Sequence, residues 1–342
     1  MEFLKFLVKK GYNVNLVSFS AIDKYLYNNL DDYYVYVNSD ATIVDVAKFT
    51  DEISSGYLKA DFSIIIDKKT YLFYSNSIFD YPILYFSYNL NKDIFKNIYE
   101  SFNHIKRKET FFCGNNFSIN SIIDASIILS KYDIEIKNLP DTPLNIFPPL
   151  SIKEQKRVLI SNILGKYSYL GLQFLLEKGF IEHYWREIFL MTKVEQIKDF
   201  HPEGNVWQHT LHAFKYLKKK DLILSLALLL HDVGKAFSEE YNGKKFYNHA
   251  QIGSKITEKF LKNLEFPFEI IKEVKNLVKY HMLPKAIGSF PESKLKRIKK
   301  QVDFNRLFEL YRADLSSSYK KLNFYYKAKK IIRKFKDDTS GL

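Results

Sequence analysis

A histidine followed directly by an aspartate, at the end of a long apolar run, is the feature that most limits how this chain folds. His231 and Asp232 come directly after the apolar run 222–230 and just before Gly234 and Lys235. An ionised carboxylate in apolar surroundings carries a large desolvation penalty unless a partner compensates it. A bound cation compensates the carboxylate and the imidazole together. The pair therefore predicts a metal site on a buried helix.

Two distant residues extend this candidate site. His209 lies in the helical pattern 205–214, whose apolar positions turn one face toward the site. Asp314 is a lone acid within the apolar face of another helical pattern, so it also requires a partner. Cys113 is the only cysteine, which excludes a cage of thiolates and leaves nitrogen and oxygen as the metal ligands.

The order of these residues, a His, then His-Asp, then a distant Asp, resembles the HD superfamily of metal-dependent phosphohydrolases. Two further histidines stand where the two-metal members of that superfamily carry extra ligands. The ligands that the resemblance implies are His209, His231, Asp232, His249, His281 and Asp314. Asp232 would bridge the two metals, His249 and His281 would hold the second, and the other three residues would hold the first. Some members use a single metal, so one ion and two ions both remain open.

The resemblance also implies the chemistry. A metal lowers the pKa of bound water from about 15.7 to about 7, which gives a hydroxide that attacks phosphate esters at neutral pH. Imidazole-rich sites suit Mn, Fe, Co, Ni or Zn better than Mg. Lys235 and Asp232 are the predicted catalytic residues, with Lys235 neutralising charge that develops on the phosphoryl oxygens. Lys235 has a second interpretation, as a cation that only complements a helix C-terminus.

The remaining histidines carry less information. His212 follows His209 by one helical turn, so we interpret it as a residue behind the site or at the surface. His104 and His183 have no functional context in the sequence.

The rest of the chain divides by its patterns. Its length of 342 residues and its 46% hydrophobic residues suffice for more than one core. The β-rich runs lie at 33–37, 62–66 and 70–74 and are mixed with helical stretches, which is typical of an α+β domain. Helical patterns then continue to the C-terminus, after a proline-rich segment at 139–149 and a capping-box start at Ser151. The domains we predict are an α+β domain at 1–124, a linker with neck-like helices at 125–195, and an all-α HD-type domain at 196–342.

A second resemblance identifies the first of these domains as a degenerate nucleotidyltransferase-like domain. The segment 201–210, His-Pro-Glu-Gly-Asn-Val-Trp-Gln-His-Thr, is similar to the entry of the HD domain in bacterial tRNA nucleotidyltransferases (CCA-adding enzymes) of the poly(A) polymerase family. The segments 117–121, 150–157 and 171–181 resemble motifs that lie upstream in that family. The resemblance covers most of the chain loosely, and it implies a nucleotidyltransferase-like fold for the N-terminal region.

The N-terminal region departs from that family where nucleotidyl transfer requires specific residues. The family holds its magnesium ions with an Asp-x-Asp pair, whereas the best-placed strand here carries Tyr34 and Tyr36. The family's glycine-rich loop is absent, because Gly11 is the only glycine in residues 1–33. We therefore interpret this region as a degenerate fold without transferase activity. The alternative is an unrelated α+β module.

Charge and hydropathy bear on the partners. The formal net charge of +13 suggests a polyanionic partner. Basic clusters at 294–300 and 327–336, with aromatic neighbours at 324–326, are able to bind phosphates and stack bases, although solvated helix faces have the same composition. No apolar stretch reaches the roughly 20 residues that a membrane span requires. The single cysteine fits a reducing compartment, so we predict a cytoplasmic protein without membrane contact.

These observations lead to three hypotheses. The first is a metal-dependent phosphohydrolase, a phosphodiesterase or phosphatase, that acts on a nucleotide or an RNA end. The second is a tRNA- or RNA-binding relative of the nucleotidyltransferases whose metal site is structural. The third, active nucleotidyl transfer, conflicts with the missing carboxylates. No motif identifies the substrate, the metal or the oligomeric state.

Overall fold

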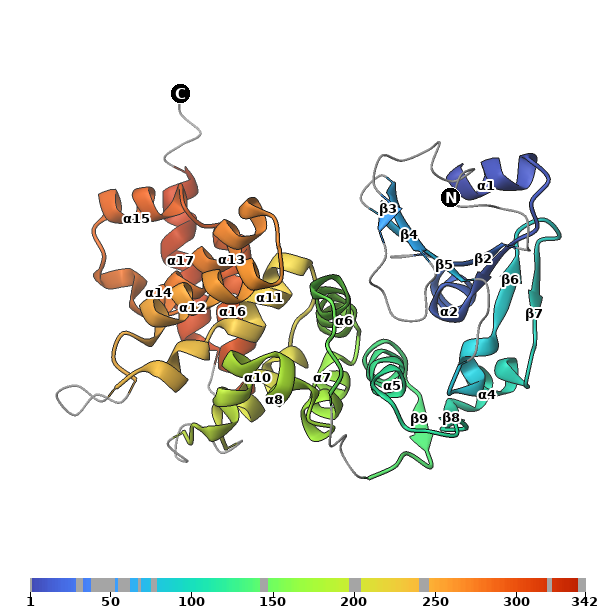
Figure 1. Ribbon diagram of the computed structural model, residues 1–342. Helices are drawn as coiled ribbons and strands as arrows, with labels where there is room; N and C mark the ends of the chain where they lie inside the picture. Colours follow the sequence, from blue (N-terminus) through green and yellow to red (C-terminus); the bar gives the residue numbers. More distant parts are fainter. Residues whose placement is uncertain are drawn as a thin grey trace. The chain divides into compact units, whose positions relative to one another are not determined.

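The computed structural model describes residues 2–28, 33–37, 53–54, 62–66, 69–74, 79–141, 147–196, 204–239, 246–318 and 322–337. The chain forms two compact units. The first comprises Met1–Leu129 and Asp133–Glu154, and the second comprises Ser130–Tyr132 and Gln155–Leu342. The first unit holds the β-strands and the second is helical (Figure 1), which confirms the predicted fold class. The predicted boundary after residue 124 falls within the helix α5 (Ile119–Lys131).

The first unit is built on a seven-stranded mixed sheet in the order β3-β4-β5-β2-β1-β6-β7. Its strands are β1 (Val14–Val17), β2 (Tyr33–Val37), β3 (Ile53–Ser54), β4 (Phe62–Ile66), β5 (Lys69–Tyr74), β6 (Ser87–Asn89) and β7 (Ile94–Lys96). Among the described strand pairs of this sheet, β2 and β5 alone run parallel, with Tyr33 opposite Tyr71. The three β-rich runs in the sequence correspond to β2, β4 and β5, so these predictions are confirmed.

The helices of the first unit are amphipathic where they cover the core. They are α1 (Glu2–Lys9), α2 (Ser18–Tyr27), η1 (Pro82–Tyr85), α4 (Ser101–Arg107) and α5 (Ile119–Lys131). On α1, Leu4 and Leu7 are buried whereas Lys5 and Lys9 are exposed, as a 3.6-residue period requires. A separate parallel pair joins β8 (Glu109–Phe111) to β9 (Glu135–Lys137).

The second unit surrounds one apolar helix. Its elements are α6 (Ile152–Leu164), α7 (Ser168–Glu177), α8 (Phe180–Tyr184), α9 (Arg186–Phe189), η2 (Leu190–Lys193), α10 (Val206–Phe214), α11 (Leu222–Leu230), η3 (Val233–Phe237), α12 (His249–Asn263), α13 (Phe268–Tyr280), α14 (Leu283–Ala286), η4 (Ile287–Ser289), α15 (Glu292–Lys299), α16 (Phe304–Ser317) and α17 (Asn323–Asp337). Helices α10, α13 and α16 pack around α11. Because α11 is apolar on every side, it has to be covered on every side.

Side chains cap the starts of several of these helices, including α6 and α11. The Ser151 hydroxyl accepts a hydrogen bond from the backbone N–H of Glu154 at 3.1 Å, so the predicted start of a helix at Ser151 is confirmed. Asp221 caps α11 by accepting from the N–H of Leu224 at 3.0 Å. No helix among the described residues is long and apolar enough to cross a membrane. Pro143 of the proline-rich segment and His201 lie outside the described residues.

Candidate metal centre

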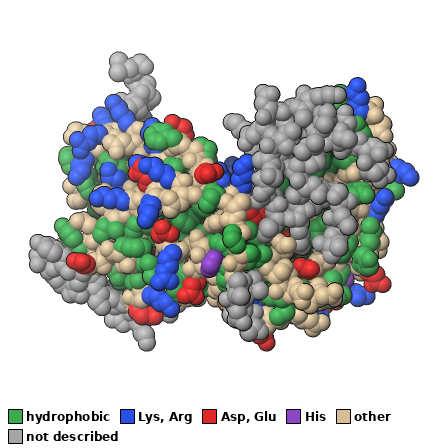
Figure 2. Space-filling view, in the orientation of Figure 1, with side chains coloured by type: hydrophobic (Ala, Val, Ile, Leu, Met, Phe, Trp, Pro, Cys, Tyr) green, Lys and Arg blue, Asp and Glu red, His purple; other side chains and the backbone are tan. Residues whose placement is uncertain are grey.

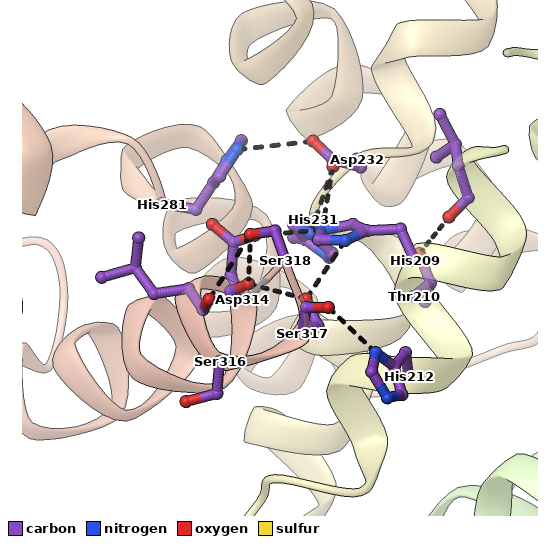
Figure 3. Close-up of polar contacts among 12 residues, drawn as sticks. His209, Thr210, His212, His231, Asp232, His281, Asp314, Ser316, Ser317 and Ser318 are labelled. Carbon is purple, nitrogen blue, oxygen red and sulfur yellow. Dashed lines mark hydrogen bonds and ion pairs between the residues drawn. The ribbon is translucent and has the colours of Figure 1, made fainter. Parts of the chain in front are cut away.

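The structure brings all six predicted ligands together in the second unit. His209 lies on α10, His249 begins α12 and Asp314 lies on α16, whereas His231, Asp232 and His281 stand where helices end. The expectation that the His-Asp pair lies within a helix is wrong. Helix α11 ends at Leu230, His231 caps it, and Asp232 precedes η3. The chain turns at this point, which directs both side chains inward (Figure 3).

The six residues form two groups of potential metal ligands. One group contains His209, His231 and Asp314, and the other contains Asp232, His249 and His281. Within each group the potential ligand atoms lie within 4.8 Å of one another. This is the division that the two-metal arrangement requires, with Asp232 placed between the two sets of histidines.

Each carboxylate oxygen of Asp232 faces a different pair of histidines. Oδ2 lies 3.3 Å from Nε2 of His231 and 3.8 Å from Nε2 of His209. Oδ1 lies 3.6 Å from Nε2 of His249 and 3.7 Å from Nε2 of His281. A carboxylate with one oxygen toward each pair has the geometry of a bridging ligand.

Backbone carbonyls fix the tautomer of three histidines. Nδ1 of His231 lies 2.8 Å from the Leu228 carbonyl, Nδ1 of His249 lies 3.0 Å from that of Phe246, and Nδ1 of His281 lies 2.7 Å from that of Val278. A carbonyl only accepts hydrogen bonds, so each Nδ1 carries the proton and donates it. Each Nε2 therefore presents a lone pair to the site, which is the form that binds a metal.

These lone pairs lack donors among the described residues. Nε2 of His231 is buried and has no hydrogen-bond partner. Nε2 of His249 and Nε2 of His281 lie 3.3 Å apart although neither carries a proton in this tautomer. Two nitrogens that bind one ion at about 2.1 Å each are separated by about 3 Å or slightly more. The residues present therefore fit a divalent metal ion, which would turn the repulsion between the lone pairs into coordination.

His209, in the group with His231 and Asp314, also presents the lone pair of its Nε2 to the site. The Ser317 hydroxyl lies 2.6 Å from the backbone carbonyl of Asp314, to which it donates, and 3.1 Å from Nδ1 of His209, from which it accepts. Nε2 of His209 then presents its lone pair to Oδ1 of Asp314 at 3.0 Å. Only a cation or a proton between these two atoms makes the contact favourable. Ser317 thus orients His209, a role that the sequence did not indicate.

Burial favours the neutral form of His249 and His281, and Lys235 favours the charged form of the Asp232 carboxylate. Burial lowers the pKa of His281 to about 4, and it also lowers the pKa of His249. Burial alone would raise the pKa of the Asp232 carboxyl, but the Lys235 ammonium holds that pKa well below its usual range. Neutral imidazole and ionised carboxylate are the forms that coordinate a metal.

Lys235 reaches the site through its ammonium group. Its Nζ lies 2.7 Å from Oδ2 of Asp232 and donates to Oε1 of Gln196, also at 2.7 Å. The side chain is only 10% exposed, so this ion pair is shielded from water. Lys235 lies within η3 and does not end a regular α-helix, and its charge is directed at Asp232.

The remaining histidines lie outside the two groups. Nδ1 of His212 donates to the backbone carbonyl of Ser317 at 2.9 Å, so His212 stands behind His209 (Figure 3). His104 belongs to the first unit, where its Nδ1 donates to the carbonyl of Glu109. His183 is exposed on α8.

A glycine contact holds His249 beside Asp232. A Cβ atom at Gly234 would lie 2.0 Å from the carbonyl oxygen of His249 and 2.5 Å from the backbone nitrogen of Gly253. The turn after Asp232 therefore touches the first turn of α12 backbone to backbone. Only glycine allows this approach.

We predict that Gly234→Ala separates α12 from η3, because backbone atoms cannot move aside as a flexible side chain does. The expected results are a loss of about 1–3 kcal/mol of stability and a weaker hold on metal by His249 and His281. Thermal unfolding and elemental analysis of the loaded protein measure the two effects. Gly288→Ala is the matched control, because its Cβ would meet only Cδ1 of Ile331 at 3.4 Å. Equal metal content and melting temperature in both variants would refute this role of Gly234.

Comparisons with known proteins place the site in a family. Residues 204–317 match the HD domain family, so the C-terminal region carries an HD domain. This range includes every residue of the two groups. The HD domain and the two groups together indicate a site for divalent metal.

Curated relatives are similar over part of their length. The CC-adding tRNA nucleotidyltransferase of Thermus thermophilus is 31% identical over 135 residues, which cover 37% of this chain and 31% of that protein. The multifunctional CCA protein of Acinetobacter baumannii is 27% identical over 156 residues, which cover 45% of this chain and 37% of that protein. The similarity thus spans about a third of the length of these relatives.

The fold is similar over nearly the whole chain to a solved structure. The Bacillus stearothermophilus CCA-adding enzyme in complex with CTP has a TM-score of 0.53 at 12% sequence identity, and the match covers 96% of this chain and 80% of that chain. The likeness concerns the fold, and it is consistent with a nucleotidyltransferase-like N-terminal region followed by the HD domain.

Proposed function

We propose that the HD domain hydrolyses a phosphate ester of a nucleotide or an RNA end with two divalent metal ions. The observation that carries the proposal is the position of Asp232, whose two carboxylate oxygens face two different pairs of histidines at 3.3 to 3.8 Å. The lone pairs of His231, His249 and His281, fixed by backbone carbonyls, support it. The HD domain match over residues 204–317 supports it as well.

The roles follow from the contacts. His209, His231 and Asp314 would hold one metal, and Asp232, His249 and His281 would hold the other. A divalent metal bound here supplies a water molecule whose pKa falls from about 15.7 to about 7. The Lys235 ammonium, which lies 2.7 Å from Oδ2 of Asp232, would neutralise charge on the phosphoryl oxygens of a bound ester.

The first prediction of this proposal concerns metal content. We expect the purified protein, or the protein loaded with manganese or nickel, to retain about two transition metals per chain. His249→Ala removes one lone pair from the second group only, so it should lower the content to about one ion. Elemental analysis measures both values. His183→Ala, which removes an exposed histidine outside the groups, is the control.

Two results would change this account. A wild-type protein without metal after loading would refute the site. An unchanged metal content in His249→Ala would refute the second ion and leave the single-metal version.

The nature of the partner is inferred from charge and from the relatives. Exposed basic side chains on α15 and α17 include Lys294, Arg297, Lys299, Lys327 and Lys330, and Figure 2 shows Lys and Arg gathered on this part of the helical unit. Phe324 and Tyr326 are exposed beside them, at 60% and 62%. Phosphate contacts and base stacking require such a mixture. One curated relative is by its name a CC-adding tRNA nucleotidyltransferase, which also favours an RNA end as the substrate.

An RNA-binding protein with a structural metal site is the second candidate. It shares the basic surface and the metal content with the first, but it predicts no hydrolysis. Metal-dependent turnover of bis-nitrophenyl phosphate separates the two, and a panel of nucleotides, cyclic nucleotides and RNA ends then identifies the substrate. Bound metal and bound RNA without turnover of any ester would support the second candidate.

We do not propose nucleotidyl transfer. Tyr34 of β2 is 7% exposed and its ring packs at 5.4 Å against Phe19, so it belongs to the core. Both groups of potential metal ligands among the described residues lie in the second unit. Magnesium ions that activate a triphosphate need carboxylate ligands, which this strand does not offer.

A further inference from the structure

The side-chain carboxamide of Gln196 has a hydrogen-bond partner at its oxygen but not at its nitrogen among the described residues. Its Oε1 accepts a hydrogen bond from Nζ of Lys235 at 2.7 Å. Its Nε2 is buried and has no hydrogen-bond partner among the described residues, and the residue is 6% exposed. Lys235 has only donors, so the oxygen of the carboxamide must face it and the N–H groups must point elsewhere. A buried donor without an acceptor is rare and requires an explanation.

The backbone fixes Gln196 relative to the metal centre. Glu195, its neighbour, forms an isolated β-bridge with Asn205, and the N–H of Val206 donates to the carbonyl of Val194 at 3.0 Å. Asn205 caps α10, the helix that carries His209. Gln196 is therefore anchored to the same helix as one of the proposed ligands.

The carboxamide also lies close to the shared carboxylate. A single ammonium, that of Lys235, lies within 2.7 Å of both Oε1 of Gln196 and Oδ2 of Asp232. The unpaired N–H groups belong to the same planar carboxamide as Oε1. The carboxamide therefore lies one ammonium group away from the carboxylate that is proposed to bind metal.

We propose that Gln196 binds the phosphoryl group of the substrate through Nε2, with Lys235 fixing the orientation of the carboxamide. A phosphoryl oxygen is an acceptor that carries negative charge, and hydrogen bonds to charged acceptors are stronger than neutral ones. The substrate would satisfy the one polar atom of Gln196 that the protein leaves unpaired. This inference rests on the proposed function, because it assumes a phosphate ester at the HD site.

Two substitutions separate phosphoryl binding from a merely structural role. Gln196→Glu keeps an oxygen for Lys235 and replaces the N–H donor with a second oxygen. Gln196→Met keeps the approximate length and removes both polar atoms. A residue that only supports Lys235 would tolerate the first change, whereas a phosphoryl-binding residue tolerates neither.

The experiment measures the binding of inorganic phosphate to the metal-loaded, full-length protein by titration calorimetry. We expect Gln196→Glu and Gln196→Met to weaken binding by about 10-fold to 100-fold, the range for loss of a hydrogen bond to a charged group. Metal content should stay at the wild-type value in both. Gln173→Glu is the matched control. It introduces the same charge on α7, where Oε1 of Gln173 accepts from Nε1 of Trp207.

The outcomes distinguish this inference from the proposed function. Phosphate binding that is equal in wild type and Gln196→Glu would overturn the role of Gln196 and leave the proposed function in place. An equal weakening in Gln173→Glu would overturn it as well, because charge alone would then explain the effect. Absence of phosphate binding in the metal-loaded wild type would overturn both.

Discussion

Asp232→Ala is expected to lose most of the bound metal and to lower phosphodiester turnover by more than about 10³-fold. Removal of one electrostatic stabiliser costs about 10²- to 10³-fold, and this carboxylate is proposed to serve both ions. Its oxygens are the only groups that face all four histidines of the site among the described residues. The variant also leaves the Lys235 ammonium buried without its acid, so Asp232→Asn serves as a second variant that keeps the shape.

Asp221→Ala is the matched control for Asp232→Ala. Asp221 lies at the opposite end of α11, where its carboxylate caps the helix through the N–H of Leu224. Loss of such a cap costs about 0.5–2 kcal/mol, so this variant should melt earlier but keep its metal and its activity. Elemental analysis and turnover are measured on both. Wild-type metal content in Asp232→Ala and Asp232→Asn would contradict the bridging role.

Lys235→Ala is expected to lower kcat by roughly 10²-fold or more while the metal content is retained. The ammonium lies 2.7 Å from Asp232, so it is placed to act on an ester bound there, but it is not a ligand. The competing interpretation, in which Lys235 complements a helix C-terminus, predicts a loss of about 0.3–1 kcal/mol of stability and no change in turnover.

Three measurements on the Lys235→Ala variant decide between these interpretations: bound metal, melting temperature and turnover. Lys215→Ala is the control, because Lys215 follows α10 and its Nζ lies over the ring of Tyr169 at 4.7 Å. Normal metal, a slightly lower melting temperature and wild-type kcat would remove Lys235 from the catalytic residues. The metal site itself would stand.

The sequence predicted those parts of the fold in which the local pattern agrees with the tertiary environment. Helix α11 coincides with the apolar run, because a helix buried on every side is apolar on every side. Strand β7 was not predicted, since its three residues are all exposed and show no alternation. The order of strands in the sheet depends on pairings between distant segments, such as Val14 with Val37, which no local pattern encodes.

The sequence also predicted the residues of the site better than their surroundings. His231 and Asp232 were recognisable because charged or basic groups after an apolar run need a partner. Ser317 and Gln196 were not recognisable in the sequence, because neutral polar residues are common and only their contacts in the folded protein distinguish these two. Ser317 meets His209 across 108 positions of sequence, and Gln196 meets Lys235 across 39. These contacts arise from the packing of α10, α16 and η3.

The most direct test of the central claim is turnover of bis-nitrophenyl phosphate by wild-type protein as metal is returned after chelation. We expect no turnover in the metal-free protein. As manganese is added, the rate of turnover should rise and reach a plateau at about two equivalents per chain. Turnover that is unaffected by chelation would contradict the central claim. Full metal binding with no turnover of this ester, or of any nucleotide or RNA end, would contradict it equally.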